Sequence, residues 1–313
     1  LVLGKLDPEN FAGGSIKLKK SSSETVLQNV LGNSLDMDAI TSAFGLVEVV
    51  DENMANAARV HAVENGEDLS QYTMIAFGGA APLHAGRLCE KLGVDRLLVP
   101  QGAGVGSAIG FLRAPFSFEA NRSVYMSLSN FNDKKIKNIF TELQLEATKF
   151  VRDCDPISEI LSEFKVYMRY SGQGWEIPIV LTKDQAMIPD VDTFKSRFIE
   201  DYVKLFGRAV DGMDIEITVW SVNATTLHEE VKSILENLHT KNTPSDGQRK
   251  LYDHQTEDFK VVDVVLRNNM IAGSSVDGPI IITEDETTII VPANRTAICQ
   301  SDGSIDMRLK VLK

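Results

Sequence analysis

The sequence predicts an α/β lobe followed by an α+β domain and a small all-β terminal module. Two observations predict the first part: the apolar run at 72–77 is followed by Gly78-Gly79 and a helical segment, and a second apolar run follows at 96–100. Strand, glycine turn, helix and strand form a βαβ unit, whose strands are expected to be parallel neighbours. The first run is interpreted as a buried strand.

The rest of the first lobe is predicted to be a polar segment followed by a long helix. Residues 1–35 are loop-like, with a short helical candidate at 23–31. Apolar residues then recur at steps of three and four across 38–65. Gly66 and Gly93 are interpreted as the ends of this helix and of the helix at 82–92. The residues on the expected packed face of the long helix are Val47, Val50, Met54, Ala58 and His61.

Beyond Pro115 the pattern changes to α+β and then to β. The predicted elements are helices at 134–152 and 191–206 and strands at 163–170, 176–181, 215–222, 259–266, 279–283, 287–291 and 305–309. A charged stretch that is rich in turn residues, at 239–255, has the composition of a linker. The predicted organisation is therefore a first lobe at 1–120, an α+β domain at 121–238, this linker, and a β-rich module at 256–313.

The overall charge argues against nucleic-acid and membrane partners. The formal net charge is −12 and the pI is near 5.0, which repels phosphate and anionic lipid surfaces. The densest basic run, Lys17 with Lys19 and Lys20, is short and is better explained as a solvated loop. No apolar run is long enough to span a bilayer.

The cysteines bear on the redox compartment of the protein, and the first residue bears on whether the chain is a fragment. Cys89, Cys154 and Cys299 lie far apart without paired spacing, so neither a disulfide framework nor a zinc site is expected, which fits a reducing cytoplasm. The chain opens with Leu1 and enters at once what looks like the interior of a domain. We therefore expect a fragment, a processed chain or a truncated reading frame.

The strongest candidate site is the turn at Gly78-Gly79. Two glycines at the carboxyl end of a strand let a ligand approach the backbone where a Cβ would collide. The helix that follows would direct its free N–H groups toward that ligand, and Pro82 is tolerated in its first turn. On spacing alone, a tight turn without a ligand is the favoured explanation.

Several segments carry a family resemblance in the same order along the chain. They are Leu1-Val2-Leu3-Gly4 with Leu6-Asp7-Pro8 and Phe11-Ala12-Gly13-Gly14; Met54-Ala55 with Val63-Glu64-Asn65-Gly66; Phe77-Gly78-Gly79-Ala80-Ala81-Pro82-Leu83-His84-Ala85 with Leu98-Val99-Pro100 and Gly104-Val105-Gly106; Met168-Arg169-Tyr170-Ser171-Gly172-Gln173; and Gly278-Pro279-Ile280 with Val291-Pro292. Together they resemble the carboxy-terminal portion of the hydantoinase A/oxoprolinase family, which includes ATP-dependent N-methylhydantoinase, 5-oxoprolinase and the acetone and acetophenone carboxylase subunits.

The resemblance implies an actin-like, RNase H-type ATPase lobe in which the double-glycine turn borders the adenosine part of ATP. It implies nucleotide contacts at Gly78, Gly79, Ala80, Ala81 and His84. Members phosphorylate an amide or enolate oxygen, so we expect either a hydrolase of cyclic amides, of the hydantoin or oxoproline type, or a subunit of a ketone carboxylase. A second large subunit of the hydantoinase B type is the implied partner, and a homo-oligomer is compatible with the family.

The chain also departs from the family. The acidic-glycine phosphate motifs, of the Asp-x-Gly-Gly-Thr kind, are expected upstream of Leu1, so the Mg²⁺ and phosphate ligands must come from a missing amino-terminal half or another chain. We assign no catalytic residue and no metal ligand here, and we expect no ATP turnover by the chain alone. Ala81 replaces the usual glycine of the turn. The competing interpretation is a non-catalytic lobe that shapes an interface.

Other chemically distinctive residues have simpler explanations. His84 is interpreted as a structural hydrogen-bonder unless it meets the nucleotide, His61 as a packed core residue, and Cys89 as a small buried hydrophobe. The glycines at 102–107 fit a dinucleotide fingerprint poorly, because Ser107 stands where glycine is needed, so a turn that enters a helix is favoured. The polar cluster of Arg169, Gln173 and Glu176 could face a substrate or a partner, although a solvated hairpin is preferred.

Overall fold

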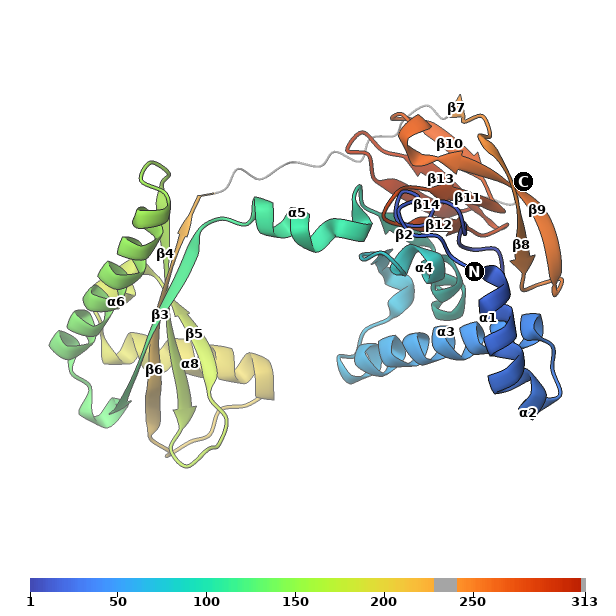
Figure 1. Cartoon of the computed structure of the whole chain (residues 1–313). Helices are drawn as coiled ribbons and strands as arrows, with labels where there is room; N and C mark the ends of the chain where they lie inside the picture. The colour runs from blue at the N-terminus through green and yellow to red at the C-terminus, as the bar shows by residue number, and fades with distance from the viewer. Residues whose placement is uncertain (228–240, 311–313) are drawn as a thin grey trace. The chain divides into compact units, whose positions relative to one another are not determined.

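The computed structural model describes residues 1–227 and 241–310, which form two compact units (Figure 1). Unit 1 comprises Leu1–Leu112 and Lys232–Lys313, and unit 2 comprises Arg113–Val231. Each unit has its own sheets and its own apolar core. The mixed α/β fold expected from the sequence is confirmed.

Unit 1 begins with helices that pack against a βαβ unit. Its elements up to the boundary are α1 (Lys20–Leu27), a π-helical turn (Gln28–Gly32), α2 (Asn33–Leu35), α3 (Ala39–Glu64), β1 (Thr73–Ile75), α4 (Ala81–Leu92), β2 (Arg96–Val99) and α5 (Gly106–Arg113). The side chain of Asp38 caps α3 by accepting the N–H of Thr41, and Gly93, with a φ of +68°, ends α4. β1 and β2 pair in parallel, as the pattern predicted.

The carboxy-terminal strands complete the sheets of unit 1. They are β7 (Lys241–Asn242), β8 (Gly247–Asp253), β9 (Asp258–Leu266), β10 (Ser274–Asp277), β11 (Ile280–Thr283), β12 (Thr288–Val291), β13 (Arg295–Cys299) and β14 (Ile305–Leu309). One sheet has the order β1-β2-β14-β13-β10-β7, and a second has the order β12-β11-β9-β8. The pairing of β14 with β2, with Met307 opposite Leu97, joins the two separate stretches of unit 1 in one sheet.

This pairing changes how the chain divides. The β-rich region lies in the same compact unit as the first lobe, whereas the sequence suggested a separate terminal module. The described part of the expected linker at 239–255 includes strands β7 and β8. The reason is that β2 offers β14 a free edge, and backbone groups at a buried edge need partners wherever in the sequence these lie. Local composition carries no signal for such a distant pairing.

Unit 2 is one antiparallel sheet covered by helices. Its elements are β3 (Ser117–Ser127), α6 (Asp133–Cys154), β4 (Ile160–Tyr170), β5 (Ile177–Leu181), α7 (Lys183–Met187), α8 (Val191–Phe206) and β6 (Ile215–Thr226), with strand order β3-β6-β4-β5. Sequence patterns located α6, β4, β5, α8 and β6, but not β3. Phe140 and Trp220 are fully buried in the core between helix and sheet, with ring centroids 5.5 Å apart.

Two expectations about burial in unit 1 are wrong. β1 is an edge strand of its sheet, and Ile75 and Phe77 are 60% and 55% exposed, so it is not a buried strand. The helix at α3 is correct, but its expected apolar face is only partly buried: Val47 packs against a core cluster, whereas Val50, Met54 and His61 are exposed. His61 is therefore no core residue. α3 instead packs through small and polar residues, which include Ala55 and Asp51.

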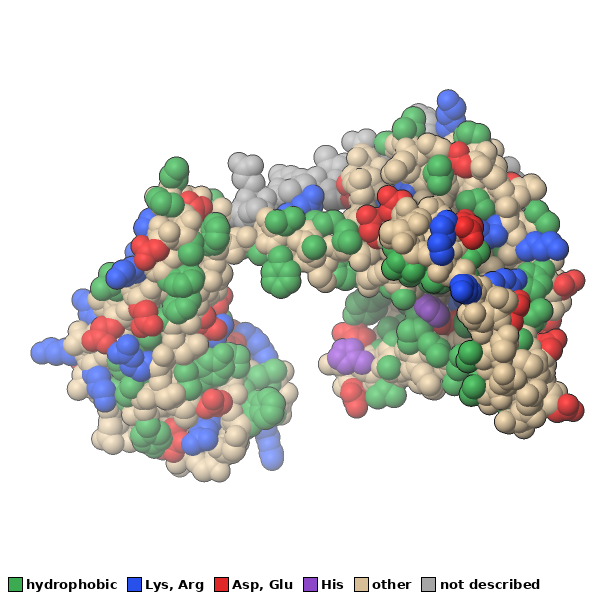
Figure 2. Space-filling model, in the orientation of Figure 1, with side chains coloured by type: hydrophobic (Ala, Val, Ile, Leu, Met, Phe, Trp, Pro, Cys, Tyr) green, Lys and Arg blue, Asp and Glu red, His purple; other side chains and the backbone are tan. Residues whose placement is uncertain are grey.

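The surface is mixed in charge. Figure 2 shows acidic and basic side chains interspersed over the face in view. Lys17 of the short basic run pairs with Glu9, in keeping with a solvated loop. Within the described residues, no helix combines the length and the apolar character that crossing a membrane requires.

Candidate functional site

The glycine turn lies at the carboxyl end of β1 and leads into α4. The N–H of Ala76 donates to the Leu98 carbonyl of β2, and the N–H of Gly78 donates to the Ala103 carbonyl, at 2.9 Å in both cases. Gly78 has a φ of +116°, a conformation that side chains with a Cβ rarely adopt. α4 begins three residues later; in its first turn Pro82 has no N–H, and the N–H of Leu83 donates to the Ala80 carbonyl at 3.1 Å.

The surface of this turn is accessible. Gly79 and Ala80 are exposed and Gly78 is partly exposed. A Cβ added at Gly78 would meet nothing within 4 Å, whereas one at Gly79 would lie 3.3 Å from the Glu286 carbonyl oxygen. The hydroxyl of Thr287 donates to the Gly79 carbonyl at 2.6 Å and ties the turn to the loop between β11 and β12. The turn is therefore held in place from one side and open on the other.

A cleft beside the turn is strongly acidic. It is lined by Leu6, Asp7, Asn10, Phe11, Ala12, Gly79, Ala80, Leu83, Thr283, Glu284, Asp285, Glu286, Thr287 and Thr288. Asp7 pairs with Arg249 at 2.9 Å and Glu284 with Arg267 at 2.8 Å. Burial raises the pKa of Glu284 above its usual value, against the opposing effect of Arg267. Because these groups repel anions, the cleft suits a neutral or cationic part of a ligand.

His84 is held by a buried carboxylate. Its Nδ1 lies 2.6 Å from Oδ1 of Asp51, which is fully buried on α3. The His84 side chain is 23% exposed, so part of the ring reaches the surface. The contact fixes the orientation of the imidazole and leaves Nε2 available. The structural role expected for His84 is present, and Asp51 is the partner that sequence reasoning missed.

An ion-pair network fixes α4 on α3 and so positions His84. Arg87 binds Glu48 through two hydrogen bonds of 3.0 Å, and Lys91 pairs with both Glu48 and Glu52 at 3.0 Å. The hydrogen bonds from Arg87, and more weakly those from Lys91, lower the pKa of Glu48 to about 2 although burial opposes the shift. The two acidic residues are four apart on α3, and the two basic residues are four apart on α4. This spacing could have predicted the network only if the two helices were already known to be neighbours.

The glycines at 102–107 enter a helix, as favoured. Gly102 has a φ of +67° and precedes a short 3-10 turn, Ala103–Val105, and then α5. A Cβ at Gly104 would lie 2.5 Å from the Cβ of Glu286, and one at Gly106 would lie 2.3 Å from the ring of Phe77. These glycines are therefore explained by close packing.

Cys89 and the polar cluster of unit 2 also have structural partners. Cys89 is fully buried, and burial raises the pKa of its thiol to about 11, so it is the inert small hydrophobe that was expected. In unit 2, Arg169 pairs with Glu216 and Gln173 donates to the Tyr202 hydroxyl. Glu176 accepts the Thr218 hydroxyl. The three side chains are partly exposed and bonded within unit 2, in keeping with the solvated hairpin that was preferred.

Comparison with known proteins identifies the family. The family model for hydantoinase/oxoprolinase matches residues 1–120, and the model for the hydantoinase/oxoprolinase C-terminal domain matches residues 128–306. The chain belongs to the hydantoinase/oxoprolinase family. The resemblance stated from the sequence motifs is thereby confirmed.

Relatives of this hydantoinase/oxoprolinase-family chain include enzymes that act on different substrates. It is 23% identical to the caprolactamase subunit alpha of Pseudomonas jessenii over 93% of its length and 43% of the relative's. It is 24% identical to the 5-oxoprolinase of Saccharomyces cerevisiae over 100% of its length and 25% of the relative's. The nucleotide-free structure of acetone carboxylase matches with a TM-score of 0.78 at 23% identity, over 99% of this chain and 45% of that one. The chain thus spans less than half the length of these relatives.

The described residues of this family member offer no evident metal centre. No group of three or more His, Cys, Asp or Glu side chains within residues 1–227 and 241–310 is arranged to hold a metal ion. Of the five residues expected to contact a nucleotide, Gly79 and Ala80 line the acidic cleft, while Gly78 precedes them and is not among its lining residues. Ala81 and His84 follow at the start of α4. Whether they contact a nucleotide stays a prediction.

Proposed function

We propose that this chain supplies the adenosine-facing wall of an ATP-dependent enzyme that hydrolyses a cyclic amide by phosphorylating its carbonyl oxygen. In this proposal unit 1 belongs to an actin-like, RNase H-type ATPase lobe. The ligands of Mg²⁺ and of the phosphates come from residues outside this chain. The observation that carries the proposal is the exposed turn at Gly78-Gly79, which lies at the carboxyl end of β1 beside the first turn of α4.

The chemistry of the neighbouring cleft supports adenosine rather than phosphate at this wall. Asp7 and Glu284 are paired with arginines, and Asp285 and Glu286 add negative charge, which repels a polyphosphate. Ribose hydroxyls and the adenine amino group are hydrogen-bond donors and complement such acceptors. The open face of Gly78 admits a flat ring close to the backbone, because no Cβ projects there.

The relatives support the reaction class. One matching structure is that of an ATP-dependent caprolactamase from Pseudomonas jessenii, with a TM-score of 0.74 and 20% identity, and a sequence relative is a 5-oxoprolinase. Amides are poor electrophiles, and transfer of a phosphoryl group to the carbonyl oxygen would turn that oxygen into a leaving group. Positioning and charge stabilisation supply most of the catalysis in such transfers.

A ketone carboxylase is the second candidate. The beta subunit of acetone carboxylase from Xanthobacter autotrophicus is 24% identical over 93% of this chain, and the acetone carboxylase structure matches over almost all of it. In that case the phosphorylated atom would be an enolate oxygen. Both candidates share the nucleotide wall, and the residues that meet the substrate would lie elsewhere.

An exposed apolar ridge on α3 supports a partner for unit 1. Leu46, Val49, Val60 and Val63 are 47%, 59%, 57% and 78% exposed on one helix. Apolar side chains at helical spacing normally face another element. We propose that this ridge packs against the missing amino-terminal half or the second large subunit of a hydantoinase B type, since the chain is under half the length of its relatives.

Ligand titration of the chain tests the nucleotide wall. We expect adenosine and Mg²⁺-ATP to bind with similar, weak affinity, with Kd on the order of 1 mM, and inorganic triphosphate not to bind, as measured by saturation-transfer NMR. Gly79→Val places two methyl groups at the turn, where even a Cβ is 3.3 Å from the Glu286 carbonyl, and should abolish binding. Gly174→Val, at a glycine of unit 2 with no atom within 4 Å of its Cβ, is the matched control.

Unfolding curves of both variants show whether the fold survives, and Gly79→Ala is the milder substitute if Gly79→Val is unstable. Equal adenosine affinity in wild type and the Gly79 variants would refute the position of the site. Absence of adenosine binding by a folded wild-type chain would favour the non-catalytic lobe.

A further inference from the structure

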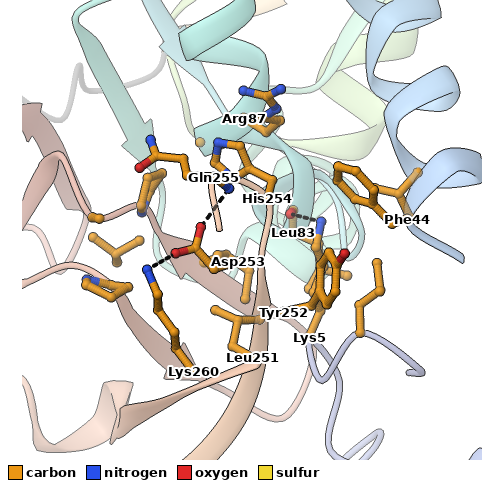
Figure 3. Close-up of a pocket in the computed structure, with 18 of the residues that line it drawn as sticks. Lys5, Phe44, Leu83, Arg87, Leu251, Tyr252, Asp253, His254, Gln255 and Lys260 are labelled. Atoms are coloured by element: carbon orange, nitrogen blue, oxygen red, sulfur yellow. Dashed lines mark hydrogen bonds and ion pairs between the residues drawn. The ribbon is translucent and has the colours of Figure 1, made fainter. Parts of the chain in front are cut away.

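A second pocket of unit 1 is distinct in its chemistry from the acidic cleft. It lies where the first residues of the chain, α3, α4 and the β8–β9 hairpin meet, and its volume is about 90 Å³. One water occupies roughly 10–15 Å³ on the same measure, so the space suits a molecule with several non-hydrogen atoms. Figure 3 shows Lys5, Phe44, Tyr252, Arg87 and His254 around it.

Lys5 is the cation of this pocket that lacks a carboxylate partner. Its Nζ makes one long contact, 3.5 Å to the Leu83 carbonyl, and forms no ion pair with any residue that the structure describes (Figure 3). Burial lowers the pKa of Lys5, while Asp51 and Glu48 oppose that shift. By contrast, Arg87 is paired with both Glu48 and Glu90. A half-buried ammonium without an ion-pair partner can bind an anion.

Two carboxylates of the same pocket each keep one unused oxygen. Asp51 is fully buried; its Oδ1 meets His84, but its Oδ2 has no hydrogen-bond partner among the described residues. Glu90 meets Arg87 and His254 through Oε2, and its buried Oε1 has no partner there either. Burial would raise the pKa of Glu90, but the hydrogen bonds from His254 and Arg87 lower it, so the group is a carboxylate. Buried hydrogen-bond acceptors in folded proteins are normally paired with donors.

We propose that this pocket binds a small zwitterionic amino acid with an aliphatic chain. The ligand's ammonium group donates to Asp51 and Glu90, and its carboxylate accepts from Lys5. An ammonium offers three donors, enough for two carboxylate acceptors, whereas a neutral amide N–H offers one. A phosphate or another multiply charged anion fits badly, because Glu48, Asp51 and Glu90 all line the pocket.

The remaining residues of the pocket wall fit the aliphatic chain of the proposed ligand. Leu3, Phe44, Leu251, Tyr252, Val262 and Ile290 contribute apolar surface. The rings of Phe44 and Tyr252 lie 5.3 Å apart and form one side. Hydrolysis of a cyclic amide yields an amine and a carboxylate on one molecule, so this ligand class also matches a product of the proposed function. The site itself is inferred from the pocket and does not depend on nucleotide binding.

Truncated ligands and one substitution test the proposal together. The probes are norleucine, pentylamine, which lacks its carboxylate, and hexanoate, which lacks its ammonium group. Calorimetric titration of the chain should show norleucine binding at least about tenfold more tightly than either fragment, since each fragment lacks one charge-assisted contact. Lys5→Met should weaken norleucine about tenfold and leave pentylamine unchanged.

Two further variants make the outcome decisive. Glu90→Gln should weaken norleucine and pentylamine but not hexanoate, whereas Lys17→Met, at an exposed lysine paired with Glu9, should change none of them. The ligand series on the wild-type chain remains informative if a variant does not fold. Equal binding of the three probes, or no norleucine binding at on the order of 10 mM, would overturn the proposal.

Discussion

The two units bury different kinds of side chain. The interior of unit 2 is aromatic and aliphatic, with Phe140, Phe164 and Trp220 in edge-to-face contact. Unit 1 buries more charged groups: Arg295 is 1% exposed and Asp51 and Asp306 are fully buried, whereas the described part of unit 2 buries Glu216. Unit 2 is also continuous in sequence, whereas unit 1 is built from two separate stretches. Arg295 and Asp306 lie on strands of the second stretch and bind residues 94–96 of the first, and both candidate sites lie in unit 1.

The largest expected effect tests whether unit 2 depends on its apolar core alone. Phe140→Ala should lower the free energy of unfolding of unit 2 by about 4 kcal/mol, because it removes a fully buried ring and leaves a cavity. Both tryptophans of the chain, Trp175 and Trp220, lie in unit 2, so tryptophan fluorescence in urea reports this transition.

Unit 1 should be unaffected by that change. Its buried Cys89 and Cys299 report its opening through their rate of thiol labelling in a Cys154→Ser background, since Cys154 is exposed. Labelling that accelerates in parallel with the loss of unit 2 would mean that the units unfold as one, and the contrast between them would not hold.

A smaller effect is expected when a buried charge of unit 1 is removed. Arg295 donates to the carbonyls of Val94 and Asp95 at 2.6 and 2.7 Å and so ties β13 to the segment that links α4 and β2. Arg295→Met keeps an apolar stem but leaves both carbonyls without this donor, which should cost about 3 kcal/mol. Faster labelling of Cys89 and Cys299 with unchanged fluorescence is the expected result. Arg113→Met, at an exposed arginine, is the control, and identical labelling of both variants would contradict the prediction.

The smallest expected effect is the pH dependence of the network between α3 and α4. The pKa of Glu48 is lowered from 4.5 to about 2, chiefly by Arg87. A lowered folded-state pKa gives stability that is complete above pH 4.5 and is lost as the pH falls toward 2. We therefore expect acid to destabilise unit 1 by roughly 1 kcal/mol more in the wild type than in Glu48→Gln, the value being limited by solvent screening.

Urea unfolding followed by circular dichroism, compared between about pH 6 and about pH 3, measures this difference. The tryptophan signal of unit 2 serves as the internal control, because Glu48 lies in unit 1. The same acid dependence in wild type and Glu48→Gln would show that the network adds nothing measurable.

Local sequence patterns predicted most elements but not which of their faces are buried. α8 and β14 have the predicted boundaries, and β1 and β2 pair in parallel as expected. On α3 the helical period was clear, yet the residues that pack are Ala55 and Asp51 rather than Val50. Periodicity shows that a helix has an apolar stripe, but it does not show which neighbour that stripe meets. A partner outside the chain leaves such a stripe exposed.

The sequence alone determined the family, the βαβ unit and the double-glycine turn, because these depend on residue types that lie next to each other along the chain. Only the tertiary structure decided that β14 completes the sheet of β2, that Asp51 holds His84, and that Lys5 shares a pocket with Glu90. These contacts join residues that are far apart in sequence. These contacts are stabilised by burial and hydrogen bonding in the folded state. Neither can be predicted from residues that are neighbours in the sequence.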